Sequence, residues 1–165
     1  MKTTFSFAWI AGALLAALLP VRGEPLLALP QNITPRDRIC FALYTVHEHT
    51  LKLTAQFYPL KNFEPFEAEL QIKRDGQWVK VAEADIIYPG YTAPFRVENW
   101  DDSREWEYRV AHNNTAFYTG IIRRNPRDRN EFVMAAFTGN SIYPQHGGDI
   151  PRTDIVENLK KLQPD

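Results

Sequence analysis

The chain has 165 residues, which is enough for one domain of ordinary size or for one small domain and part of another. Its formal net charge of −1 excludes a strongly basic protein that binds nucleic acid or anionic membranes through clustered Lys and Arg. Cys40 is the single cysteine, so no internal disulfide can stabilise the chain, and its apolar neighbours predict a buried, unreactive thiol.

Residues 1–23 have the pattern of a secretory signal peptide. Lys2 gives a basic start, an apolar run extends from Phe5 to Leu19, and Val21-Arg22-Gly23 fits a cleavage site. The run is shorter than the roughly 20 residues that span a bilayer, so we expect cleavage after Gly23 and no membrane anchor. The remaining chain has 17 basic and 20 acidic residues and is expected to be secreted or periplasmic, with residues 24–37 as an N-terminal extension.

Residues 38–124 predict an antiparallel β-sandwich. Apolar and polar side chains alternate in short runs, as in half-buried strands, and Asp75-Gly76 and Asn113-Asn114 are hairpin turns. Seven such runs without helical periodicity are typical of an immunoglobulin-like or fibronectin-like sandwich, although the Cys-Trp-Cys signature of immunoglobulin domains is absent. The predicted strands span residues 38–45, 51–58, 66–74, 77–82, 92–97, 106–111 and 116–123.

The large aromatic residues of this region are expected to fill the core. Because buried aromatics dominate protein cores, we prefer this interpretation to an exposed platform that binds sugars. The residues concerned are Trp100, Trp106, Tyr108 and Phe117.

The histidines give little evidence of a metal site. His47-Glu48-His49 could present alternating imidazoles to one ion, but the three residues lie between two strands and predict a solvated turn. His112 is expected at the edge of a hairpin.

The pattern changes after the sandwich. Residues 125–131 are polar and contain Pro126, which is typical of a linker. Residues 132–137 predict a strand buried on both faces, followed by a loop and an amphipathic helix with Ile155, Leu159 and Leu162 on one side. Residues 132–165 therefore read as an incomplete α/β segment, strand, loop and helix, whose next strand is missing.

The loop Thr138-Gly139-Asn140-Ser141 is the best local candidate for a ligand site. It follows the carboxyl end of the predicted strand, where open α/β sheets bind ligands. Asn140, His146 and Asp149 could supply polar contacts, or Gly139 and Asn140 could simply turn the chain. Asp149 is also a plausible helix cap.

A family resemblance rests on the same segment. The run Phe132-Val133-Met134-Ala135-Ala136-Phe137-Thr138-Gly139-Asn140-Ser141, with the helix at residues 154–165, resembles the start of a calcineurin-like metallophosphoesterase domain of the alkaline phosphatase D type. These enzymes often carry a fibronectin-like module before the catalytic domain, and Trp106-Glu107-Tyr108-Arg109-Val110 is similar to its late strand.

The resemblance implies that this chain is the N-terminal portion of a phosphate mono- or diester hydrolase. The full-length parent would hold two divalent metal ions (Fe, Mn, Zn or Ca) on motifs located beyond Asp165, in a catalytic domain that completes this chain in cis. Relatives often have Asp-x-His after their first strand, where this chain has Gly139-Asn140-Ser141. We therefore expect no catalytic residue, metal or cofactor in the fragment itself. The alternative is a complete secreted sandwich that binds a glycan or a protein.

Overall fold

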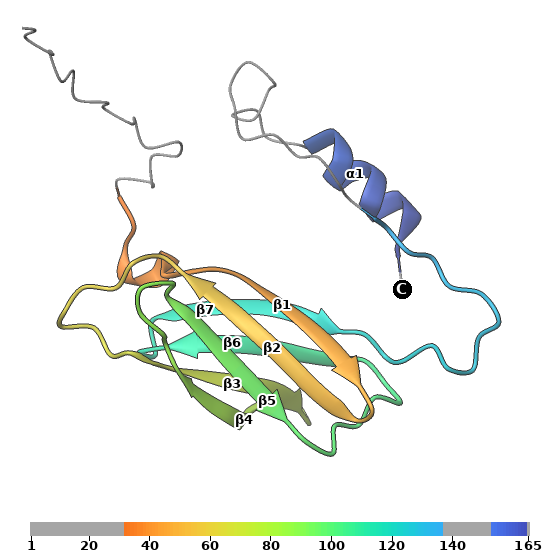
Figure 1. The fold of residues 1–165 in the computed structure, drawn as a ribbon, viewed down its shortest axis with the longest axis horizontal. Helices are drawn as coiled ribbons and strands as arrows, with labels where there is room; N and C mark the ends of the chain where they lie inside the picture. The colour runs from red at the N-terminus through yellow and green to blue at the C-terminus, as the bar shows by residue number, and fades with distance from the viewer. Residues whose placement is uncertain (1–31, 137–152, 165) are drawn as a thin grey trace, which may run out of the picture.

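The alternating residues form seven antiparallel strands in the computed structural model, which describes residues 32–136 and 153–164. Figure 1 shows the strands in two packed layers, with one short helix near the C-terminus. Each predicted strand is present, with ends that shift by no more than three residues. The elements are η1 (Pro35–Asp37), β1 (Ile39–His47), β2 (Thr50–Phe57), β3 (Glu67–Arg74), β4 (Gln77–Asp85), β5 (Thr92–Val97), β6 (Trp106–His112), β7 (Ala116–Ile122) and α1 (Thr153–Leu162).

The two sheets have the strand orders β1-β2-β5 and β4-β3-β6-β7. Asp75 and Gly76 join β3 to β4 with φ angles of 48° and 79°, as a type I′ turn requires. Glu48 and His49 also have positive φ angles, and they turn the chain between β1 and β2. Short turns therefore fix the register of both hairpins.

The core lies between the sheets and comes from the inward-facing position of each strand. Leu51, Leu53, Ala55 and Phe57 of β2 are all buried, as the alternation predicts. Trp100, Trp106 and Tyr108 are buried too, but Phe117 is 46% exposed and the prediction for it was wrong. Its neighbour Ala116 points inward, so Phe117 must point to the outer face.

Tyr108 occupies space that a glycine leaves open. It lies directly opposite Gly120 of β7, and a Cβ atom on Gly120 would be 2.6 Å from Tyr108 Cε1. The ring is 3% exposed and makes an edge contact with Tyr44 of the other sheet at 6.4 Å between centroids. Tyr108 thereby packs against both sheets.

The buried strand predicted at residues 132–137 is not formed over residues 132–136, which have no regular secondary structure. Phe132, Val133 and Met134 are 66%, 46% and 76% exposed. A central strand needs neighbours for its backbone hydrogen bonds, and within the described ranges no strand pairs with this segment. The prediction was therefore wrong for these residues, while residue 137 lies outside the described part.

Helix α1 has the predicted amphipathic sequence, but none of its residues is buried. Ile155, Val156 and Leu162 are all exposed, and Leu159 is half-buried. A helix of ten residues is marginal in water without tertiary packing. Its apolar side is therefore a surface without a partner among the residues described.

Replacing Gly120 with Ala should lower the free energy of unfolding by about 1–3 kcal/mol, because the new methyl group overlaps the buried Tyr108 ring. Gly90→Ala is the matched control, since its Cβ would meet nothing closer than Thr92 Oγ1 at 4.0 Å. That variant should change stability by no more than about 0.5 kcal/mol. Urea unfolding of both variants measures the difference, and equal effects would contradict the packing described.

Tyr108 should also make the fold sensitive to alkali. Burial, with smaller effects of Tyr118 and Tyr44, raises the pKa of Tyr108 from 10.0 to about 12. The pKa of Tyr108 is higher in the folded state than in the unfolded state, so burial of the neutral phenol contributes its full stabilisation below pH 10. This stabilisation is lost as the pH rises through 12. The difference between the two pKa values corresponds to about 3 kcal/mol in the free energy of unfolding. Urea midpoints measured from pH 9 to 12 should fall more steeply for the natural chain than for Tyr108→Phe, and parallel curves would refute the assignment.

Candidate functional site

The predicted ligand residues Asn140, His146 and Asp149 lie outside the described residues, so their arrangement stays a prediction. The turn at His47-Glu48-His49 is described, and the side chains of His47 and Glu48 are 86% and 85% exposed. Within residues 32–136 and 153–164, no group of three or more His, Cys, Asp or Glu side chains could hold a metal ion.

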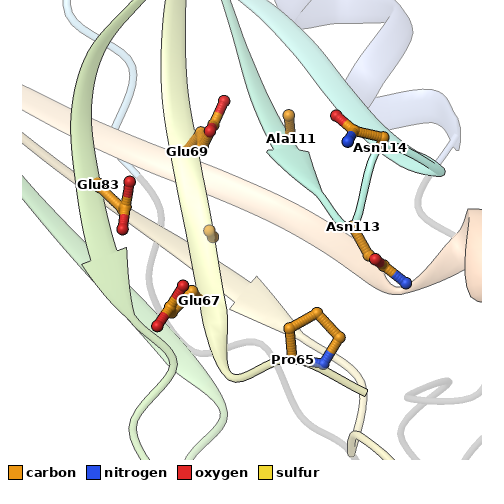
Figure 2. Close-up of a pocket in the computed structure, with 8 residues that line it drawn as sticks. Pro65, Glu67, Glu69, Glu83, Ala111, Asn113 and Asn114 are labelled. Carbon is orange, nitrogen blue, oxygen red and sulfur yellow. The ribbon is translucent and has the colours of Figure 1, made fainter. Parts of the chain in front are cut away.

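A hollow of about 170 Å³ lies on the four-stranded sheet, beside the start of β3 and the turn between β6 and β7 (Figure 2). Glu67 and Glu69 of β3 and Glu83 of β4 line one side. Asn113 and Asn114 of the turn line the other side. The hollow thus combines three carboxylates with two amides.

Two of the three carboxylates in this hollow, those of Glu69 and Glu83, have partners in the protein. Lys80 Nζ lies 3.3 Å from Glu69 Oε1 and 2.7 Å from Glu83 Oε2. Gln71 donates a hydrogen bond of 2.7 Å to Glu69, and this bond, with Lys80, lowers the pKa of the Glu69 carboxyl against the effect of desolvation. We interpret the hollow as part of a surface network in which Lys80 offsets the repulsion between the cross-strand carboxylates Glu69 and Glu83. We do not interpret it as a catalytic site.

The outer face of the same sheet carries an aromatic row, which consists of Trp78, Arg109 and Phe117. The guanidinium carbon of Arg109 is 4.7 Å from the Trp78 ring centroid and 4.6 Å from that of Phe117. Arg109 Nε also donates to Gln71 Oε1 at 2.7 Å. Each exposed cation–π contact contributes about 0.5–1 kcal/mol. These contacts hold the Trp78 and Phe117 rings against Arg109, so the row is an ordered surface formed by β4, β6 and β7.

A buried ion pair lies just before the start of β1. Arg38 Nε donates to Glu64 Oε1 at 2.7 Å, and the two side chains are only 4% and 5% exposed. The Lys61 backbone N–H donates to the second oxygen of Glu64 at 2.7 Å. Desolvation acts to raise the pKa of Glu64, but these hydrogen bonds lower it overall. The pair is internally satisfied and is structural.

His112 ends β6 beside the hairpin turn, as predicted, and its side chain is buried. It is 1% exposed, its Nε2 lies 2.8 Å from the Pro65 carbonyl oxygen, and its ring makes an edge contact with Phe57. The side chain is buried because His112 continues the inward-facing row of Trp106, Tyr108 and Val110 on β6, where alternate residues share a face. Its position in the strand outweighs its polarity.

Asp102 joins three segments at the end of the sandwich where the chain leaves it. This carboxylate, 6% exposed, accepts hydrogen bonds from Arg127 Nη2 at 2.6 Å and Asn125 Nδ2 at 3.2 Å, and it lies 3.3 Å from His49 Nδ1. Its backbone carbonyl accepts the Asn125 N–H at 2.8 Å. This Asp102 junction (Asp102, His49, Asn125 and Arg127) ties the predicted linker to the sandwich.

No local pattern in the sequence distinguishes Asp102 from its neighbour Asp101. Asp101 and Ser103 form the local hydrogen bonds of a polar turn, and Asp102 lies between them. Only the folded chain brings the Asp102 carboxylate to Asn125 and Arg127, which lie beyond two further strands. Sequence reasoning therefore missed the junction.

No protein-family model, curated protein or solved structure matches this chain. Among the helices that the structure describes, none is long and apolar enough to cross a membrane. The evidence on function is therefore the chemistry of the residues themselves.

Replacing Asp102 with Ala should release the linker, because Arg127 and Asn125 lose their shared acceptor. Hydrogen bonds to a charged group contribute about 1.5–3 kcal/mol, so local opening should increase roughly tenfold or more. Trypsin cleavage after Arg124, Arg127 or Arg129 measures this opening. Asp101→Ala is the control, since its exposed side chain bonds Ser103 and Arg104. Cleavage at the same rate in both variants would exclude the proposed role of Asp102.

Proposed function

We propose that this chain is the N-terminal part of a secreted or periplasmic metallophosphoesterase. In this proposal, residues 38–124 are a fibronectin-like accessory module, and residues 132–165 begin a calcineurin-like catalytic domain of the alkaline phosphatase D type. The observation that carries the proposal is the exposure of apolar side chains in two segments after the sandwich, together called the exposed apolar surface. Its members are Phe132 and Met134 in the first segment and Ile155, Val156 and Leu162 in α1.

This apolar surface is not needed by the sandwich, whose core closes between β1 and β7. Burying side chains of this size contributes about 1.5–3 kcal/mol each, and clustered exposed apolar residues commonly mark a surface that packs against something else. A sheet with Phe132 and Val133 in one strand, covered by the apolar side of α1, would bury them all. The rest of a catalytic domain in the same chain would supply the neighbouring strands that this arrangement needs.

The proposal places the metal chemistry outside the described residues. No described group of side chains fits a dinuclear centre. The parent's two metal ions would require ligands from residues that follow Asp165, and the fragment by itself is proposed to be inactive towards phosphoesters. Two such ions would activate water and neutralise the phosphoryl oxygens when bound.

The aromatic row favours the alternative function, a sandwich that binds a glycan or protein without catalysis. Trp78 and Phe117 come from different strands but share the Arg109 guanidinium, so their rings are held in fixed positions. Rigid aromatic side chains are enriched in binding surfaces. The row could serve the same purpose in the accessory module of an enzyme.

The product of the native gene distinguishes the two functions. An antibody against the sandwich should isolate a protein larger than the 19.1 kDa chain, with two equivalents of divalent metal and hydrolysis of a chromogenic phosphoester. The chain of residues 24–165, purified alone, should show neither property. A native product of the size of that chain, without metal or hydrolysis, would contradict the phosphoesterase and favour the binding module.

A further inference from the structure

The turn between β6 and β7 carries a tripeptide that can accept an N-linked glycan. Asn113, Asn114 and Thr115 form the sequence Asn-x-Thr, in which x is any residue except proline. This sequence is the acceptor of N-glycosylation in secreted proteins. A tight hairpin turn uses Asn113 and Asn114 but has no need of a threonine at position 115. The turn chemistry therefore leaves the complete tripeptide unexplained.

The Asn113 side chain is accessible in the folded protein. All three residues of the tripeptide are exposed, and Asn113 and Asn114 turn the chain with φ angles of 49° and 52°. Figure 2 shows the Asn113 amide pointing away from the carboxylates of Glu67 and Glu69. Among the residues that the structure describes, none forms a hydrogen bond with this amide. A sugar attached to Asn113 Nδ2 would therefore break no contact within the sandwich.

The hydrogen bonds that close the turn do not involve the Asn113 side chain. The Thr115 backbone N–H donates to the His112 carbonyl at 3.0 Å, and the Thr115 hydroxyl lies 3.5 Å from the same oxygen. His112 and Ala116, which flank the turn, are both buried. The hairpin is thus held by its backbone and by the residues on either side, so it can form with a glycan on Asn113.

The turn lies at the end of the sandwich opposite the linker. Strand β7 begins at Ala116 beside the turn and ends at Ile122, just before the linker (Figure 1). Its seven residues span about 23 Å at the usual rise of a strand. A glycan on Asn113 would therefore lie away from any domain that follows the linker.

A second tripeptide of this type, Asn32-Ile33-Thr34, is less suitable. The Thr34 hydroxyl donates to Asp37 at 2.5 Å, and Pro35 follows directly. Proline restricts the residue before it to extended backbone, and Thr34 has φ −82° and ψ 163°. Because Thr34 is constrained in both ways and Thr115 is not, the inference concerns Asn113.

We propose that Asn113 is an N-glycosylation site that is modified during export. This inference rests on the secretion included in the proposed function, but not on phosphoester hydrolysis. The donor is an oligosaccharide joined to a lipid through a diphosphate. Asn113 Nδ2 forms a bond with C1 of the first sugar, and the bond between C1 and the diphosphate oxygen breaks. The lipid diphosphate leaves with that electron pair, and the amide nitrogen loses one proton.

Mass spectrometry of the native gene product tests the site. An N-glycosidase removes the glycan and converts the modified asparagine to aspartate, which carries a heavy oxygen when the reaction is run in labelled water. Trypsin cleavage after Arg109 and Arg123 releases residues 110–123, which contain no other acceptor tripeptide. This peptide should carry labelled aspartate at position 113. Recovery of the peptide with unmodified Asn113 before glycosidase treatment would overturn the proposal.

Thr115→Ala and Thr115→Ser, introduced into the native gene, are a matched pair. Both variants keep Asn113, but only serine keeps the hydroxyl that the acceptor sequence requires. Thr115→Ala should lose the glycan at position 113, whereas Thr115→Ser should retain it. Equal labelling of the two variants would contradict the proposal. The labelled peptide of the natural chain decides the question even if neither variant folds.

The modification and the enzyme activity can fail separately. Thr115→Ala should leave metal content and phosphoester hydrolysis unchanged, because the turn lies at the end of the sandwich away from the linker. A product that carries the glycan but neither binds metal nor hydrolyses phosphoesters would refute the phosphoesterase alone. A product that hydrolyses phosphoesters but has an unmodified Asn113 would refute the glycosylation site alone.

Discussion

The two sheets pack against each other through one buried apolar cluster, and the turns and loops of the sandwich are anchored to it. Leu51, Leu53, Leu70 and Val110 belong to one buried cluster, and each is at most 1% exposed. Burying such side chains contributes about 1.5–3 kcal/mol each, against a large loss of conformational entropy. Since Cys40 is the single cysteine, this cluster must supply the stability that disulfides give many secreted domains.

Alternation within strands made most of the sandwich predictable, because period two fixes which residues face the core. Leu51 to Phe57 and the Asp75-Gly76 turn follow directly from local chemistry. Phe117 was misplaced in the core because residue type outweighed its position in the strand, where it lies next to the inward-facing Ala116. Asp102 could not be predicted, since its burial depends on Asn125 and Arg127, which only the fold brings near. The residue types of 132–136 favour a strand, but a strand also needs a partner. The candidate ligand residues Asn140, His146 and Asp149 lie outside the described residues, so the structure does not test that site.

Two ion pairs, each with a buried carboxylate, hold loops in place at opposite ends of β1. Arg38 and Glu64 satisfy each other at the beginning of that strand, and Asp102 binds the linker at the other end. A buried charge is tolerated only when it is paired, so both contacts hold their loops in one geometry. The linker consequently leaves the sandwich in a fixed direction. An accessory module that sets the position of a following domain would need this property.

The sandwich is a self-sufficient unit from which the linker leaves in a fixed direction, whereas α1 requires a partner to be stable. Native-state hydrogen exchange on the full chain tests it most directly. Amides of β2, β3 and β6 should exchange only through global unfolding, the Asn125 amide should show intermediate protection, and α1 should exchange within about tenfold of unstructured peptide rates. Protection of α1 equal to that of the core strands would contradict the account.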